Sequence, residues 1–177
     1  VYYYARHNNR DVVIDIFDRI VKAAEGAALG TGTQMEYEMI GGGYELLPND
    51  RLQQIVHKNL EAIGGVTYSP QELQFASTIS ESLGQKSLQP EVASGVQPFK
   101  TEGKAYGSTD VGDVSFTVPT AGIRIATWVP GTPAHSWQAV AAGGTGIGTK
   151  GMMVAAKTLS STAIDLFSNP KAISEAK

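Results

Sequence analysis

The residues best suited to chemistry gather around a histidine in the second half of the chain. His135 follows Gly131, Thr132 and Pro133 in a tight turn that comes directly after a predicted strand. Loops at strand ends are common places for binding and catalytic residues. A neutral imidazole held in such a loop is a good zinc ligand when a neighbouring acceptor fixes its tautomer. The pattern therefore makes His135 a candidate metal ligand.

Two carboxylates form a second candidate group. Asp110 and Asp113 lie three residues apart in the glycine-rich segment 107–113, before another predicted strand. Carboxylates in such turns can bind a metal or orient a metal-ligating histidine. The alternative is that they only cap the turn. A zinc site needs three or four protein ligands, and this sequence offers His135 and one of these carboxylates.

The other two histidines have simpler interpretations. His57 lies beside the apolar face of a predicted helix, which favours a packing or surface role. His7 follows the end of a predicted strand, where it could contact a ligand, but a histidine in a turn is usually solvated. Neither residue is placed in the candidate metal site.

The glycine-rich segment 144–151 resembles a phosphate-binding loop. A P-loop needs Gly-Lys-Ser/Thr, because the lysine reaches the phosphates and the hydroxyl holds magnesium. Here Thr149 precedes Lys150 and Gly151 follows it, so the match fails on both sides. Nucleotide binding remains an alternative. The segment otherwise predicts a close approach of backbone to backbone, or a carboxylate at a helix N-terminus.

The elements that must position these residues follow from hydrophobic periodicity and capping signals. The sequence predicts strands at 1–6, 34–39, 114–118 and 122–129, and a long loop at 85–105. It predicts helices at 10–29, 51–63 (with Asp50 as its cap), 70–83, 139–142, 152–167 and from 170 to the end. The first forty residues are therefore expected to form a β-α-β unit. Because two strands rarely stand alone in water, this unit needs further strands.

Composition excludes several classes of protein. The 177 residues carry a net charge of -3, too balanced for the basic surface of a nucleic-acid binder. No apolar run approaches the roughly 18 residues of a membrane span, and no signal peptide is visible. The absence of cysteine excludes disulfides and thiolate metal sites. Because the chain starts at Val1 in an apolar run and ends at Lys177 inside a predicted helix, we expect it to be a piece of a longer protein.

Taken together, these segments resemble the zinc-dependent amidohydrolases and carboxypeptidases of metallopeptidase family M-twenty. The specific motifs are Ser-Thr-Asp-Val-Gly-Asp-Val-Ser at 108–115 and Gly-Thr-Pro-Ala-His at 131–135. Supporting matches lie at 3–6, 24–29, 47–49, Pro119 and 150–157, so the resemblance covers essentially the whole chain. Many family members have a histidine before the Lys-Gly pair, where this chain has Thr149.

The resemblance implies an α/β fold in two parts. Residues 1–43 would be the second half of an α+β, ferredoxin-like lid that carries a dimer contact, with a hinge near Gly41–Gly43. Residues 44–177 would be the C-terminal part of an α/β catalytic domain. The family uses two divalent metal ions, usually zinc, with manganese as the alternative. By motif position His135 would be a metal ligand, and Asp110, Asp113, Gly131 and Thr132 would line the site. Arg6 would bind a substrate carboxylate.

The resemblance also implies a cytoplasmic hydrolase of an amide to an amino acid, such as an aroyl-glutamate, an N-acyl amino acid or a dipeptide. The remaining family metal ligands and the general base have no counterpart in this chain, so we expect the chain alone to be inactive. The expected partners are a small amide substrate and a second copy through the lid, or a different subunit. The alternative function is a non-catalytic assembly module, and the two would differ in bound metal.

Overall fold

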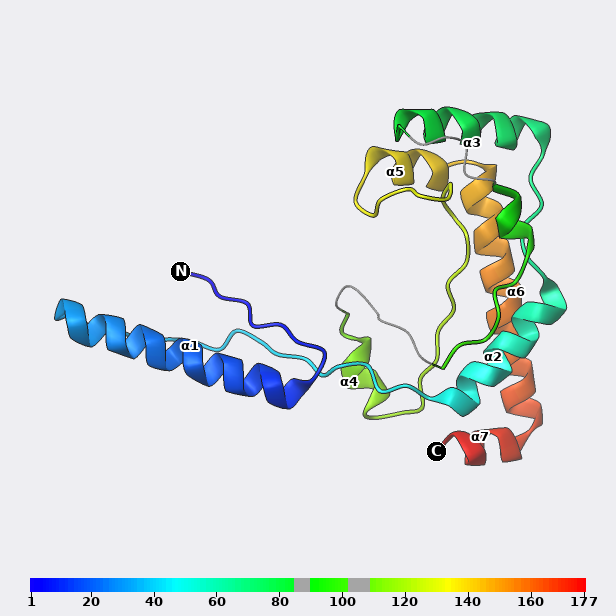
Figure 1. The fold of residues 1–177 in the computed structure, drawn as a ribbon. Helices are drawn as coiled ribbons and strands as arrows, with labels where there is room; N and C mark the ends of the chain where they lie inside the picture. The colour runs from blue at the N-terminus through cyan, green and yellow to red at the C-terminus, as the bar shows by residue number, and fades with distance from the viewer. Residues whose placement is uncertain (85–89, 102–108) are drawn as a thin grey trace. The chain divides into compact units, whose positions relative to one another are not determined.

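The computed structural model describes residues 1–84, 90–101 and 109–177, and these residues form helices joined by irregular segments (Figure 1). The helices are α1 (Arg10–Thr31), α2 (Asp50–Ile63), α3 (Pro70–Ser82), the short 3-10 helix η1 (Pro90–Ser94), α4 (Val111–Ser115), α5 (Trp137–Gly143), α6 (Gly146–Ser168) and α7 (Pro170–Ala176). The chain divides into two compact units. The first comprises Val1–Pro48 and Ala105–Thr120, and the second Asn49–Lys104 and Ala121–Lys177.

The predicted α/β fold is wrong for the described residues, which contain helices and no strand. Segments 1–6, 34–39 and 122–129 are irregular, and the predicted strand at 114–118 is replaced in part by α4. The reason is the pairing of the backbone. A strand leaves its N–H and C=O groups unsatisfied unless neighbouring strands bind them. The alternating pattern at 34–39 has no such partner, and Tyr37 and Met39 lie exposed.

In one of the segments predicted as strands, a side chain binds backbone N–H and C=O groups that a neighbouring strand would otherwise bind. The Gln53 amide in α2 donates to the carbonyl of Gly122 at 2.7 Å and accepts from its N–H at 3.3 Å. Both backbone groups of Gly122 are thus bound by one side chain. Gly122 is therefore tied to α2 without joining a sheet.

Each predicted helix is present, because its capping signals act locally, but the prediction of a loop up to residue 151 is wrong: α6 begins at Gly146, and α4 was not predicted. Asn9 accepts from the N–H of Val12 at the start of α1, and Ser69 and Glu72 form a reciprocal capping box at the start of α3. One cap differs from the prediction. Asn49, not Asp50, accepts from the N–H of Leu52 at 2.9 Å, and its Nδ2 also donates to the carbonyl of Ala176.

The first unit is thinly packed. Helix α1 buries none of its 22 residues, and its clearest side-chain contact is the edge-to-face pair of Phe17 and Tyr37, with ring centroids 5.8 Å apart. In water, helices draw most of their stability from packing an apolar face. Against the described residues, helix α1 therefore lacks the burial that normally stabilises a helix of its length.

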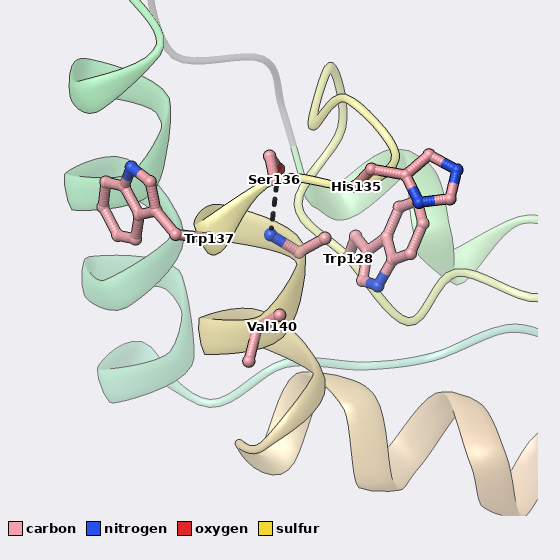
Figure 2. Close-up of a pocket in the computed structure, with 6 residues that line it drawn as sticks. Trp128, His135, Ser136, Trp137 and Val140 are labelled. Carbon is pink, nitrogen blue, oxygen red and sulfur yellow. Dashed lines mark hydrogen bonds between the residues drawn. The ribbon is translucent and has the colours of Figure 1, made fainter.

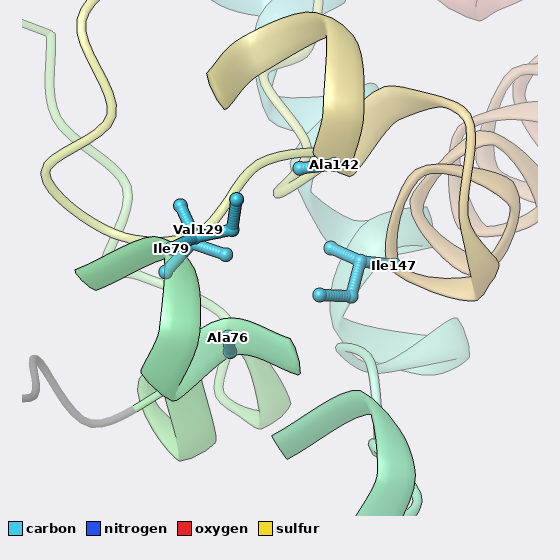
Figure 3. Packing of buried hydrophobic residues seen from close by; sticks show 5 residues of the cluster. All are labelled: Ala76, Ile79, Val129, Ala142 and Ile147. Atoms are coloured by element: carbon cyan, nitrogen blue, oxygen red, sulfur yellow. The ribbon is translucent and has the colours of Figure 1, made fainter. Parts of the chain in front are cut away.

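The second unit is built around α6, which packs against α2, α5 and α7. Its hydrophobic core joins α3, α5, α6 and the loop before α5 (Figure 3). The core residues are Ala76, Ile79, Val129, Ala142 and Ile147. Val129 belongs to the loop that carries the candidate site, so this loop is anchored in the core from its first residues.

Of the predicted loop at 85–105, residues 90–101 are described, and 85–89 and 102–105 lie outside the described residues. Helix η1 accepts from the N–H of Val66 through the carbonyl of Ala93 at 2.8 Å. Among the described residues, no helix combines the length and the hydropathy that crossing a membrane requires.

Candidate functional site

The loop that carries His135 begins with a tight turn. The N–H of Thr132 donates to the carbonyl of Val129 at 3.1 Å, with Pro130 and Gly131 between them. Gly131 has φ +80, a left-handed conformation that this turn type requires at its third position. Because Val129 is 2% exposed and belongs to the hydrophobic core, the first residue of the turn is held in place by packing.

His135 has an unusual backbone. With φ +60, it is the one non-glycine among the described residues that has a positive φ. Such outliers persist only where the surroundings impose them, and they are frequent at functional sites. Here the surroundings are Pro133 and Ser136. The Ser136 hydroxyl donates to the carbonyl of Pro133 at 2.7 Å and accepts from the N–H of Ala139 at 3.3 Å, so it holds the loop and begins α5.

A concavity of about 610 Å³ opens beside His135. Its lining residues are Trp128, His135, Ser136, Trp137, Ala139 and Val140. Figure 2 shows the Trp128 indole next to the His135 imidazole, with Trp137 projecting away from this pair at the start of α5. Sequence analysis missed both tryptophans. The available signal was their number, since the 177 residues contain two tryptophans and both flank the histidine turn.

The described residues do not fit a complete metal site. In the part of the chain that the structure describes, no three side chains of histidine, cysteine, aspartate or glutamate converge on one point. His135 has the right donor chemistry, but among the described residues it belongs to no group of three possible ligands. Thr132, expected to line the site, has a buried Oγ1 without a hydrogen-bond partner in the described structure. The metal role of His135 therefore stays a prediction.

Asp110 and Asp113 lie in the first unit, whereas Gly131, Thr132 and His135 lie in the second. Asp110 precedes α4, and its side chain makes no capping hydrogen bond. The roles predicted for these residues in lining a site remain predictions.

Asp113 binds backbone. Its Oδ1 accepts from the N–H of Tyr44 at 2.9 Å, and nearby the Oγ of Ser115 accepts from the N–H of Leu47 at 2.9 Å. The ring of Tyr44 also contacts Phe116, at 4.7 Å between centroids. Gly112 allows this approach, because a Cβ there would lie 2.8 Å from the Tyr44 carbonyl carbon. The motif around α4 thus binds segment 44–47, and its first residues, 107 and 108, lie outside the described residues.

The remaining candidate residues have local contacts. The guanidinium of Arg6 lies 5.5 Å from the centroid of the Tyr4 ring. His57 packs against the ring of Phe99 at 5.3 Å, which confirms the packing role expected for it. His7 accepts from a backbone N–H two residues along the chain.

The glycine-rich segment is the start of α6, and a carboxylate lies on it. A Cβ on Gly146 would overlap Oε1 of Glu72. The same carboxylate accepts from Nζ of Lys150 at 2.6 Å, and Nζ also donates to the carbonyl of Thr67 at 2.9 Å. Anions are stabilised at helix N-termini by the exposed N–H groups and the helix dipole. The Glu72 carboxylate thus lies beside the first residue of α6 and is bound by Lys150, which agrees with the expectation of a carboxylate at this helix N-terminus.

The electrostatics of this cluster agree with its geometry. The hydrogen bond from Lys150 lowers the pKa of Glu72, and the backbone N–H of Ser69 lowers it further. Burial raises the pKa of the neighbouring Tyr68, and the negative charge of Glu72 raises it again. Glu72 is thus held ionised between α3 and α6.

The relationship of this chain to a known protein comes from comparison of sequences, since the site geometry does not identify it. The chain is 35% identical, over 94% of its length, to a subunit of the p-aminobenzoyl-glutamate hydrolase of Escherichia coli (strain K12). This chain is a relative of that hydrolase subunit. The match confirms the resemblance inferred from the two motifs at 108–115 and 131–135. The chain spans about 40% of the length of the E. coli protein. No family model matches it, and no solved structure does.

Proposed function

We propose that this chain is part of a hydrolase that cleaves an amide bond to an amino acid. The substrate class is p-aminobenzoyl-glutamate, an N-acyl amino acid or a dipeptide. The observation that carries the proposal is the 35% identity, along nearly the whole chain, to a protein whose name states that activity. The cytoplasmic location expected from the sequence belongs to the same proposal.

The chain by itself is inactive in this proposal. Hydrolysis in the proposed family depends on two divalent metal ions, zinc or manganese, and the described residues hold no group of three possible ligands. A metal site requires three or four protein ligands. The other ligands would have to come from the part of the relative that this chain does not span. We therefore assign no reaction step to the described residues.

The test compares residues 1–177 with the same chain joined to the preceding part of its reading frame. Release of p-aminobenzoate from p-aminobenzoyl-glutamate is followed with added zinc, and after chelation. We expect turnover by the longer protein with zinc and no turnover by residues 1–177. Metal-dependent turnover by residues 1–177 would overturn the predicted inactivity. Failure of the longer protein to hydrolyse any amide of the class would overturn the hydrolase.

A matched pair of variants tests the metal role of His135. In the longer protein, His135→Ala should lower the bound zinc from two ions to one, measured by elemental analysis. His7→Ala removes an imidazole from the first unit and should leave the zinc content unchanged. Equal zinc content in the two variants would remove His135 from the metal site.

A second candidate function is a non-catalytic assembly module. The first unit favours it, because Tyr2, Tyr3 and Tyr4 are 67–80% exposed and α1 buries no residue. Exposed apolar patches of this kind mark interaction surfaces. The partner would be a second copy of the chain or a different subunit. Molar mass by light scattering identifies assembly, and a zinc-free, inactive longer protein would favour this function over the hydrolase.

A further inference from the structure

The concavity beside His135 is lined mainly by aromatic and aliphatic groups. Trp128 is 39% exposed, Trp137 63% and Val140 78%, although Val129 and Ala139 beside them are buried. The loop thus holds large apolar side chains at the surface while its own backbone is anchored in the core. Ligand sites are typically concavities of about 300–1,000 Å³ with such a lining, and the 610 Å³ here lies in that range, in a shallow concavity that is widely open to solvent and would contact one face of a planar group.

Apart from His135, no side chain of the lining can carry a charge. None of the six lining residues is a lysine or an arginine. The Ser136 hydroxyl is already engaged with Pro133 and Ala139. A glutamate moiety carries two carboxylates, which favour cationic or bidentate partners. A planar aromatic ring instead gains from offset or edge contact with an indole.

We propose that Trp128, in the concavity next to His135, binds the aromatic ring of an aroyl-amide ligand, with Trp137 at the rim of this site. The inference rests on the proposed function for the identity of that ligand, and it assigns the aroyl half to this concavity and the amino-acid half to another surface. Both side chains line the concavity (Figure 2), and the loop that carries them holds His135 in a left-handed backbone conformation at φ +60.

The chain offers a direct reporter. Its two tryptophans both line the concavity, so indole emission excited at 295 nm comes from this place alone. Trp137→Phe leaves Trp128 as the single emitter. N-benzoyl-L-glutamate should then shift or quench the emission in a saturable way. N-acetyl-L-glutamate, which has the same amino-acid half and no ring, should leave the emission unchanged at the same concentrations.

Calorimetry with the same two ligands supplies the affinities. Trp128→Leu keeps an apolar side chain and should weaken N-benzoyl-L-glutamate about three- to tenfold, the range that an aromatic pair contributes. Phe167→Leu is the matched control, because this aromatic residue of α6 is 90% exposed and lines no part of the concavity. Equal binding of the two ligands, an unchanged emission with N-benzoyl-L-glutamate, or equal affinity in the two leucine variants would overturn the proposal.

Activity separates this proposal from the hydrolase itself. Suppose that the longer protein hydrolyses N-acetyl- and N-benzoyl-glutamate with the same kcat/KM, and that Trp128→Leu affects both equally. The assignment of the ring site is then wrong, whereas the proposed hydrolase function is supported. If benzoyl binding is seen but no amide is hydrolysed, the ring site stands and the hydrolase fails.

Discussion

A methyl group added at Gly148 should destabilise the second unit by about 2 kcal/mol. In the structure a Cβ on Gly148 would lie 2.7 Å from the carbonyl carbon of Gly143 and 2.8 Å from its Cα, well inside the 3.4–4 Å of an ordinary contact. Both atoms are backbone, so no side chain can rotate to make room. Overpacking of this kind costs about 1–3 kcal/mol, and we take the upper end. The better helix propensity of alanine returns about 1 kcal/mol.

The matched control is Gly143→Ala. No atom lies within 4 Å of a Cβ at that position, so the added methyl group should be neutral or slightly stabilising. The two variants place the same change five residues apart in one glycine-rich segment. They therefore separate the loss of a close approach from a general effect of removing glycine.

Urea unfolding followed by circular dichroism at 222 nm measures the difference. With a slope of about 2 kcal/mol/M, a loss of about 2 kcal/mol moves the midpoint of Gly148→Ala down by about 1 M. Equal midpoints for the two variants would refute the packing argument. Saturable binding of ATP to the unmodified chain, abolished by Gly148→Ala, would instead restore the phosphate-loop interpretation.

Three further variants test the contacts described above. Lys150→Met removes the main cause of the lowered pKa of Glu72. A lowered carboxylate pKa stabilises the fold above the ordinary carboxyl range, and this stabilisation is lost as the pH falls through the folded pKa. The difference in urea midpoint between Lys150→Met and the unmodified chain should therefore be largest near pH 7 and shrink in acid. Ile147→Ala, at a side chain 1% exposed, should cost about 2–5 kcal/mol in urea unfolding; a cost below 1 kcal/mol would place it outside the core. Asp113→Ala should speed amide hydrogen exchange at Tyr44 about tenfold, and unchanged exchange would show that their hydrogen bond is absent in solution.

The helices were predictable because their signals lie within a few residues. Asn9, Ser69 with Glu72, and Asn169 cap the first turns that follow them, and the structure places helix starts there. The one misassigned cap, Asp50 for Asn49, involves neighbouring residues that both favour this position. The strands were not predictable in the same way, since a strand depends on partners distant in the sequence.

The candidate site was predictable in part. The turn 131–135 after a predicted strand drew attention to His135, whose metal role stays a prediction, and the relative bears out the resemblance that this motif carries. The two tryptophans were missed because an isolated aromatic residue has no spacing that distinguishes a ligand contact from core packing. The backbone role of Asp113 was missed because its partner, Tyr44, is 69 residues away.

By itself, the sequence determined most of the helices, most of their caps and the relationship to a known hydrolase, because each depends on short-range signals or on residue identity at matched positions. The tertiary structure alone decided which polar groups meet. It joined the Glu72 carboxylate of α3 to Nζ of Lys150 in α6, and it paired the Gln53 amide of α2 with the backbone of Gly122. These contacts join residues far apart in the chain, and their geometry depends on packing around Val129 and Ile147 that no local pattern encodes.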